Sequence, residues 1–343
     1  MEHPKPQHRV TLADVARECR LDKSTVSRVL NLPPGAYPVS EDTRRRIHAC
    51  VERLGYRPNW RARALATGET GAVGLCFSAA RSLTRPMLSA EIALAHELKA
   101  SGYHLQFIPL GDSPDEWQDL LQARRVDGYI VLNGVAGLFC QLLFDSGVPA
   151  VLVNFDAGVA LDSVYLDDEM GARLATRHLI ELGHRRVAFL HWDYDKVGQR
   201  HPSLAIRQRA YRETMREAGL KPRVVVYARP QETVADQLLD GMPATAVVCY
   251  SHRDAVWLLN GLWRRGRRVP DDVSVIAFND VFPTECTIPP LTVVSTMEAR
   301  MGRIGGQMLF ERIRGEAGDA PRRVVLPENL VIRKSTARAP DAK

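Results

Sequence analysis

The chain has 343 residues, of which 45% are hydrophobic and 25% charged, and it carries a formal net charge of +6. This composition is ordinary for a soluble protein of two or three domains, and no apolar run approaches the ~18 residues that would span a membrane. The six cysteines are scattered without a C-x-x-C pair or a histidine at metal-ligand spacing, so no metal or cofactor is expected.

The positive charge is concentrated near the N-terminus. Residues 1–68 hold 13 Lys and Arg against 7 Asp and Glu, whereas the remaining residues hold 33 of each sign. Such asymmetry is typical of a small nucleic-acid-binding domain attached to a neutral body. The first ten residues, MEHPKPQHRV, are polar and lack the apolar segment of a signal peptide, so we expect the protein to stay in the cytoplasm.

The stretch from Val10 to Asn31 has the pattern of a DNA-binding helix-turn-helix. Thr11 and Asp14 are spaced as a capping box, and apolar residues then recur along one helix face. After a short turn, Asp22 can cap a second helix whose valines and Leu30 face inward. The outer face presents only polar side chains, namely Lys23, Ser24, Ser27, Arg28 and Asn31. A helical hairpin with a solvated face would show the same pattern, but the local positive charge favours DNA binding.

A third helix and a short linker complete this region. Ser40 is placed to begin the helix and Gly55 to end it, which predicts a three-helix headpiece over residues 1–58. Residues 59–70 contain helix-forming residues but only about two turns of length, and an isolated helix that short is marginal in water. The segment is therefore either a hinge helix that forms only with support or a plain linker.

From Ala72 onward, short β-branched runs alternate with longer helical segments, and Gly residues end several of the helices. The predicted strands are Ala72–Phe77, Tyr103–Ile108, Gly128–Leu132, Ala150–Asn154, Ser163–Leu166, Val187–Leu190, Val224–Tyr227, Ala246–Cys249 and Val273–Phe278. The predicted helices include Ala90–Ser101, Asp115–Arg124, Glu169–Leu182, Leu204–Ala218 and Asp254–Arg265. This alternation predicts parallel sheets covered by helices, and the length favours two α/β subdomains.

Several long motifs resemble the lactose-repressor/galactose-repressor (LacI/GalR) family of bacterial transcription regulators. They are TLADVA, STVSRVLN, VSEDTRRRI, LGYRPN and ARALATG in the first region, then VDGYIVL, DDEMGARLATRHLIELGHRRVAFL, RRVPDDVSVIAFND, PPLT and LPENLVIRKST. The resemblance implies a helix-turn-helix headpiece, a hinge helix, and a core like a type I periplasmic sugar-binding protein. It also implies a homodimer that binds a pseudo-palindromic DNA operator, with a small molecule in the core cleft setting the DNA affinity.

The resemblance also places the domain boundaries. The core would span residues 71–336, with an N-subdomain over about 71–166 and 296–325 and a C-subdomain over about 167–295 and 326–336. Residues 337–343 would form a tail.

The family's DNA-contacting positions fall on matching residues of the headpiece and linker. Lys23 and Ser24 match the base readers, and Leu65 matches a leucine that enters the minor groove while Ala62 allows close approach of two hinges. The remaining matched positions, placed for phosphate or further groove contacts, are Thr11, Thr25, Ser27, Arg28, Asn31 and Asn59. The sequence departs from the family at Arg20, where a turn glycine is usual, at Asp22, where serine is usual, and in a longer loop after Asn31.

The expected effector site is less acidic than is common in the family. Arg207 matches an arginine that reaches bound effectors. The other matched positions hold neutral or basic side chains, namely Asn154, Ser251, His252 and Asn279. Two interpretations remain open: a sugar acid or phosphorylated sugar that pairs with Arg207, or a neutral sugar, or no ligand at all, in an altered pocket.

Other functions are less well supported by the sequence. No nucleophile elbow, H-E-x-x-H, phosphate-binding or dinucleotide-binding motif is present, so no enzyme is expected. A periplasmic transport protein would share the core but would need a signal peptide in place of the basic headpiece. Control by a partner protein in place of a metabolite is the remaining alternative.

Overall fold

The computed structural model describes residues 10–31, 36–57, 68–78, 88–135, 137–194, 201–228, 234–240 and 243–340. The chain divides into two compact units, residues 1–71 and 72–343. None of the described helices is both long and apolar enough to cross a membrane.

The described residues of the first unit form three helices: α1 (Leu12–Cys19), α2 (Lys23–Asn31) and α3 (Glu41–Leu54). Val15, Val26 and Ile47, one from each helix, are fully buried together. The capping box predicted at the start of α1 is present, since Asp14 N donates to Thr11 Oγ1 and Thr11 N donates to the Asp14 carboxylate at 2.9 Å. The described part of this unit is therefore a small helical headpiece built around a shared apolar core.

Arg20 ends α1 in a left-handed conformation, with φ 50° and ψ 48°. This conformation costs a residue with a Cβ roughly 1–2 kcal/mol, which is why glycine is favoured in such a turn. Its backbone N–H still donates to carbonyls of the preceding turn. The turn thus forms without glycine, at a local cost to stability.

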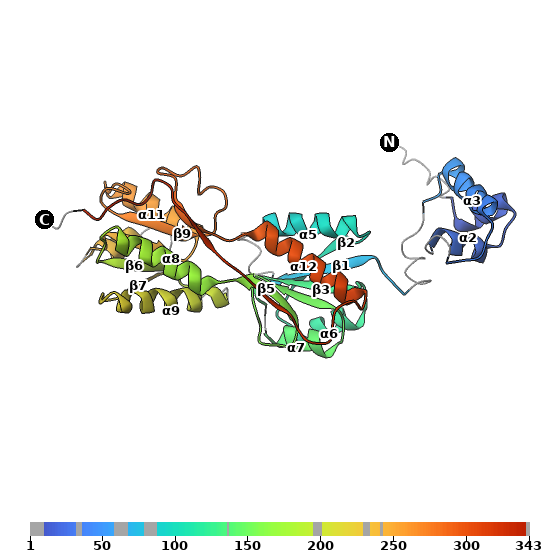
Figure 1. Ribbon diagram of the computed structural model, residues 1–343, viewed down its shortest axis with the longest axis horizontal. Coiled ribbons are helices and arrows are strands. Elements are labelled where there is room, and N and C mark those ends of the chain that lie inside the picture. The colour runs from blue at the N-terminus through green and yellow to red at the C-terminus, as the bar shows by residue number, and fades with distance from the viewer. Residues whose placement is uncertain are drawn as a thin grey trace, which may run out of the picture. The chain divides into compact units, whose positions relative to one another are not determined.

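The described residues of the second unit form two six-stranded sheets (Figure 1). Sheet A has the spatial order β11 (Arg323–Leu326), β5 (Asp162–Leu166), β4 (Ala150–Val153), β3 (Gly128–Leu132), β1 (Ala72–Ser78) and β2 (His104–Leu110), all parallel. One face is covered by α5 (Leu88–Ala100) and α12 (Glu298–Ile313). The other face is covered by α6 (Pro114–Gln122) and α7 (Gly137–Asp145).

Sheet B has the order β12 (Asn329–Val331), β10 (Thr292–Ser295), β9 (Ser274–Phe278), β8 (Ala246–Cys249), β6 (Val187–Trp192) and β7 (Arg223–Tyr227). Its strands are parallel except β12, which is antiparallel to β10. One face packs against α8 (Asp168–Glu181) and α9 (Pro202–Glu217). The other packs against α10 (Val234–Leu239) and α11 (His252–Arg264).

The chain passes between the two sheets three times in the described part of the second unit: from β5 to α8, from β10 to α12, and from β11 to β12. Each passage is only a few residues long. The third consists of Pro327 and Glu328 alone. Any change in the relative position of the sheets must therefore involve these short connections.

All nine predicted strands are present, with ends that differ by at most two residues. The sequence pattern did not indicate β10, β11, β12, α7, α10 or α12. In α12 the reason is the presence of Gly302, Gly305 and Gly306, because glycine disfavours helix. The structure shows why they are tolerated, since a Cβ at Gly302 would lie 2.3 Å from the backbone oxygen of Ala90 in α5. The glycines lower the helix propensity of α12, but they allow α5 and α12 to pack closely against each other.

We expect Gly302→Ala to force α5 and α12 apart and to lower the free energy of unfolding by about 1–3 kcal/mol, the usual cost of overpacking. The change would be measured as a lower Tm in thermal unfolding. Gly318→Ala is a matched control, because a Cβ there meets nothing within 4 Å. Equal Tm values for Gly302→Ala and the wild type would contradict the close packing.

Candidate nucleic-acid interface and ligand site

The outer face of α2 is polar, as the sequence pattern predicted. Lys23, Ser24 and Arg28 are exposed, while Val26 and Val29 are buried in the headpiece core. Lys23 and Ser24 are the first two residues of the helix, where a recognition helix places the side chains that contact bases. The face carries hydrogen-bond donors and no acidic side chain.

Tyr37, in the loop after α2, contacts two of the predicted DNA-contacting residues. The Arg28 guanidinium lies 5.2 Å from the centre of the Tyr37 ring, within the range of a cation–π contact. Hydrogen bonds from Thr25 and Arg28 lower the pKa of the Tyr37 phenol. Sequence reasoning missed Tyr37, and its only indication was the extra length of the loop.

The other predicted DNA-contacting residues are partly engaged within the headpiece or lie outside the described residues. Asn31 Nδ2 donates to Ser27 Oγ at 3.2 Å, which ties the last turn of α2 to the turn before it. Thr11 is exposed and caps α1. The predicted hinge positions Asn59, Ala62 and Leu65 lie outside the described residues.

Among the predicted effector residues, Arg207 of α9 is held in place by contacts with several groups of the core. Its side chain is 5% exposed. Its Nε donates to Asp168 Oδ1 at 2.6 Å, its NH1 donates to the backbone oxygen of Tyr250 at 3.0 Å, and its guanidinium lies 3.9 Å from the centre of the Phe278 ring. Tyr250 and Phe278 follow or end β8 and β9, so Arg207 lies at the carboxyl ends of sheet B.

A second carboxyl group, Glu328, lies beside Arg207 on the β11–β12 connection. Its Oε1 is 3.7 Å from Arg207 NH2, and the side chain is fully buried. Neither carboxyl oxygen has a hydrogen-bond partner among the described residues. Burial raises the pKa of Glu328 to about 8, although the charge of Arg207 opposes that shift. Burial likewise raises the pKa of Asp168.

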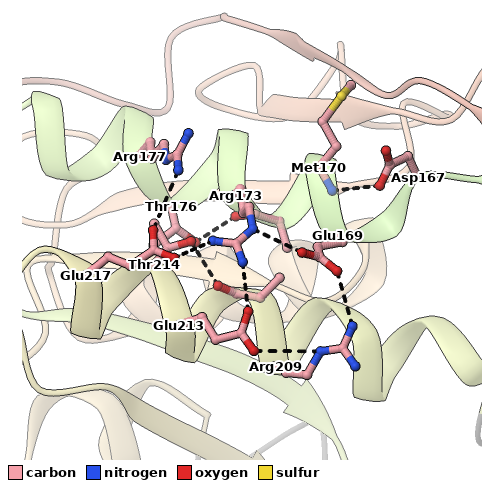
Figure 2. A network of polar contacts seen from close by, with 12 residues as sticks. Asp167, Glu169, Met170, Arg173, Thr176, Arg177, Arg209, Glu213, Thr214 and Glu217 are labelled. Atoms are coloured by element: carbon pink, nitrogen blue, oxygen red, sulfur yellow. Dashed lines mark hydrogen bonds and ion pairs between the residues drawn. The ribbon is translucent and has the colours of Figure 1, made fainter.

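The two helices that carry Asp168 and Arg207 are joined by ion pairs (Figure 2). Arg173 of α8 donates to Glu213 and Glu217 of α9 at 2.8 Å each, and to Glu169 of its own helix at 3.3 Å. Exposed ion pairs contribute little to stability individually, but Arg173 is only 23% exposed and contacts three carboxylates. The network thereby holds α8 and α9 in register with each other.

Asp254 of α11 is the centre of another buried polar cluster, at the carboxyl ends of β6, β7 and β8. Its carboxylate accepts hydrogen bonds from the side chains of Ser251 at 2.5 Å and Tyr227 at 2.6 Å, and from Trp192 N at 3.0 Å. Burial raises the pKa of Asp254 despite these donors. In the sequence, Ser251 and Asp254 have the S-x-x-D spacing that is typical of a helix start, and this spacing could have indicated Asp254.

The predicted residues Ser251 and His252 lie at the start of α11. Ser251 is the N-cap and is held by Asp254. His252 Nδ1 is buried and has no hydrogen-bond partner in the described part of the chain. Burial and the neighbouring Arg253 lower the pKa of His252 to about 4, so its ring is neutral at physiological pH.

The two predicted asparagines directly follow strands in left-handed conformations. Asn154 follows β4 with φ 70°, and Asn279 follows β9 with φ 74°. Asn154 Nδ2 also donates to Asn133 Oδ1 at 2.8 Å, and Asn133 itself follows β3 in the same conformation. Sequence reasoning missed Asn133.

Four of the five predicted effector residues thus lie at the carboxyl ends of the strands of sheet B. Arg207 contacts Tyr250 and Phe278, which immediately precede Ser251 and Asn279 in the chain. His252 follows on the same helix. Asn154 belongs to sheet A, at the carboxyl end of its own strand. Carboxyl ends of parallel strands are where ligands bind in open α/β sheets.

Comparison with known proteins agrees with this architecture. The family "Bacterial regulatory proteins, lacI family" matches residues 11–59, and the family "Periplasmic binding protein-like domain" matches residues 176–336. The HTH-type transcriptional regulator CelR of Thermobifida fusca is 33% identical over 96% of this chain and 99% of the relative.

This chain belongs to the LacI family.

It is a DNA-binding transcription regulator and not an enzyme. Two solved structures of the family cover nearly the whole chain. A CelR–cellobiose complex is 31% identical, covers 95% of this chain and all of its own, and has a TM-score of 0.68. The Lac repressor dimer bound to operator and the anti-inducer ONPF is 25% identical, covers 96% of this chain and all of its own, and has a TM-score of 0.82. The predicted fold class, a helix-turn-helix headpiece joined to two parallel-sheet subdomains, is confirmed for this LacI-family chain.

The raised pKa of Glu328 gives a pH-dependent prediction. The folded protein keeps this proton up to about pH 8, whereas the unfolded chain loses it near the ordinary value of 4.5. The stability contributed by Glu328 is therefore full below that ordinary value and is lost as the pH rises through about 8. We expect Glu328→Gln, which cannot ionise, to melt higher relative to the wild type at about pH 9 than at about pH 5.

Thermal unfolding of both proteins across this pH range measures the difference. Glu316→Gln, at an exposed position, is the control and should follow the wild type at every pH. A constant difference in Tm between Glu328→Gln and the wild type would show that Glu328 does not titrate in this way.

Proposed function

We propose that this LacI-family regulator is a repressor whose affinity for its DNA operator is set by a small sugar or sugar derivative. The ligand binds in the core at the carboxyl ends of the strands. The observation that carries the proposal is the position of Arg207, which lies at the carboxyl ends of sheet B between α8, β8, β9 and the β11–β12 connection. A ligand that contacts Arg207 would therefore act on sheet B and also on the β11–β12 connection between the two sheets.

DNA recognition is assigned to α2 of a homodimer on a pseudo-palindromic operator. Lys23 and Ser24 are exposed at the start of the helix, and Lys23 can donate to the O6 and N7 acceptors of guanine. Arg28 and Thr25 act differently from Lys23, because they also hold Tyr37. The dimeric Lac repressor on its operator supports this mode of binding. The hinge assigned to Asn59, Ala62 and Leu65 remains part of the proposal.

We expect Lys23→Ala to reduce the preference for operator over scrambled DNA by about 1–3 kcal/mol, the value of one good base contact. The measurement is fluorescence anisotropy on a duplex selected by the full-length protein from a random pool, and on a scrambled duplex of the same composition. Arg45→Ala is the control, since it removes one exposed positive charge from α3. It should weaken both duplexes alike. An unchanged preference in Lys23→Ala would refute the assignment of α2.

The ligand is proposed to be a neutral sugar and not a sugar acid or phosphate. The charge of Arg207 is already paired with the Asp168 carboxylate, and two of its nitrogens donate to protein oxygens. The Glu328 carboxyl group occupies the space beside a third nitrogen. A ligand carboxylate would have to compete with these partners at a site that is otherwise rich in neutral hydroxyl and amide groups. The cellobiose complex of CelR supports a neutral sugar as the class of ligand.

Calorimetry on the full-length protein decides between the two classes. We expect saturable heat from neutral sugars, cellobiose among them, and none from glucuronate or glucose 6-phosphate. Heat only from the charged compounds would reverse the assignment. If no sugar of either kind bound, control by a partner protein would become the better explanation.

A further inference from the structure

A separate pocket of about 390 Å³ lies at the amino ends of the strands of sheet B, whereas Arg207 lies at their carboxyl ends. Arg185 and Arg186 immediately precede β6, and Lys221 and Arg223 lie at the start of β7. Asp240 also lines the pocket, and apolar side chains complete it. These residues come from three segments that are adjacent only because β6, β7 and β8 are parallel.

The pocket is distinct from the proposed sugar site. It lies at the amino ends of β6, β7 and β8, whereas Tyr250, the partner of Arg207, follows the carboxyl end of β8. Ala244 lines the pocket and Tyr250 is six residues further along the chain. At about 3.3 Å per residue this separates the two places by roughly 20 Å.

The lining of the pocket has an excess of positive charge, with four cationic side chains and one carboxylate. Arg185 and Arg186 are held by hydrogen bonds to backbone carbonyls, which position their side chains without cancelling their charge. Arg186 Nε donates to the oxygen of Pro243 at 2.9 Å, and Arg185 NH1 donates to that of Ile180 at 3.1 Å. Arg223 donates to the backbone oxygens at the end of α10.

Lys221 differs from the arginines. It is exposed, and no hydrogen bond or ion pair to another described residue holds its ammonium group. Lys221 therefore adds positive charge to the pocket, and its ammonium group does not stabilise the described part of the core. Residues 69–343 balance 33 basic against 33 acidic side chains, so this concentration of positive charge is local.

We propose that this pocket binds a small polyanion, such as a metabolite that bears two phosphate groups or a phosphate and a carboxylate. Guanidinium groups bind phosphate oxygens through paired hydrogen bonds, and the ammonium of Lys221 adds a movable point charge. The volume suits a ligand of metabolite size. Val187, Pro222 and Ala244 line the pocket with apolar surface, which gives a ligand's carbon skeleton a place to pack. The site is a second ligand position, independent of the sugar.

The test is calorimetric titration of the full-length protein with sodium pyrophosphate at physiological ionic strength. We expect saturable binding with one pyrophosphate per chain. Lys221→Glu should weaken it about tenfold or more, since it removes a charge-assisted hydrogen bond and adds a repulsion. Because Lys221 is exposed, the variant should keep the wild-type Tm.

Arg125→Glu is the matched control. It reverses one exposed charge ahead of β3 in sheet A, away from this pocket, and should bind pyrophosphate as the wild type does. The absence of saturable binding to the wild type would overturn the proposal. Equal weakening in Lys221→Glu and Arg125→Glu would also overturn it, because only the overall charge would then matter.

Discussion

A buried guanidinium needs partners for its charge and for its N–H donors, and Arg207 obtains them from three parts of the core. Asp168 lies at the start of α8, Tyr250 follows β8, and Glu328 lies on the connection between the two sheets. Removing an ion from water costs several kcal/mol in real proteins, so such a group persists only where its surroundings compensate. Here the ring of Phe278 and the Asp168 carboxylate do so. Protonation of Glu328 at neutral pH avoids burying a second negative charge beside Asp168.

In the proposed function, this arrangement would link ligand binding to the geometry of the core. The α8–α9 ion pairs fix Asp168 and Arg207 relative to each other, while Glu328 attaches a passage between the sheets to the same point. A Cβ at Gly171 would lie 1.8 Å from Glu328 Oε2, so the connection packs directly against the α8 backbone. A ligand that shifts Arg207 must therefore shift α8, the connection, or both. Such differential contact with two states is what allosteric control requires.

Much of the fold was accessible from the sequence because it depends on periodicity and helix ends. Thr11, Ser40 and Gly55 limit the headpiece helices as predicted, since capping is a local property of the chain. The glycine-containing α12 was not accessible, because its glycines serve contacts with α5 that only the folded chain reveals.

The sites were less predictable than the fold, because they depend on contacts that only the folded chain reveals. Family motifs indicated Arg207, but its partner Glu328 is 121 positions away and has no motif that indicates burial. Tyr37 and Asn133 are similar cases, since only the folded chain brings each of them into contact with predicted residues. The basic pocket combines three segments through the register of parallel strands, which no local pattern encodes. Contacts between residues far apart in the chain are therefore what the local amino-acid pattern does not predict.

The most direct test of this account measures whether Arg207 transmits ligand binding to the headpiece. The dissociation constant of full-length protein for its selected operator would be measured with and without the sugar that binds it, in the wild type and in Arg207→Lys. Lysine keeps the charge but lacks the planar, paired donors of arginine. The account predicts that the sugar changes operator affinity of the wild type about tenfold or more. It also predicts that Arg207→Lys binds operator normally without sugar and shows no response to it. A response of wild-type size in Arg207→Lys would contradict the account.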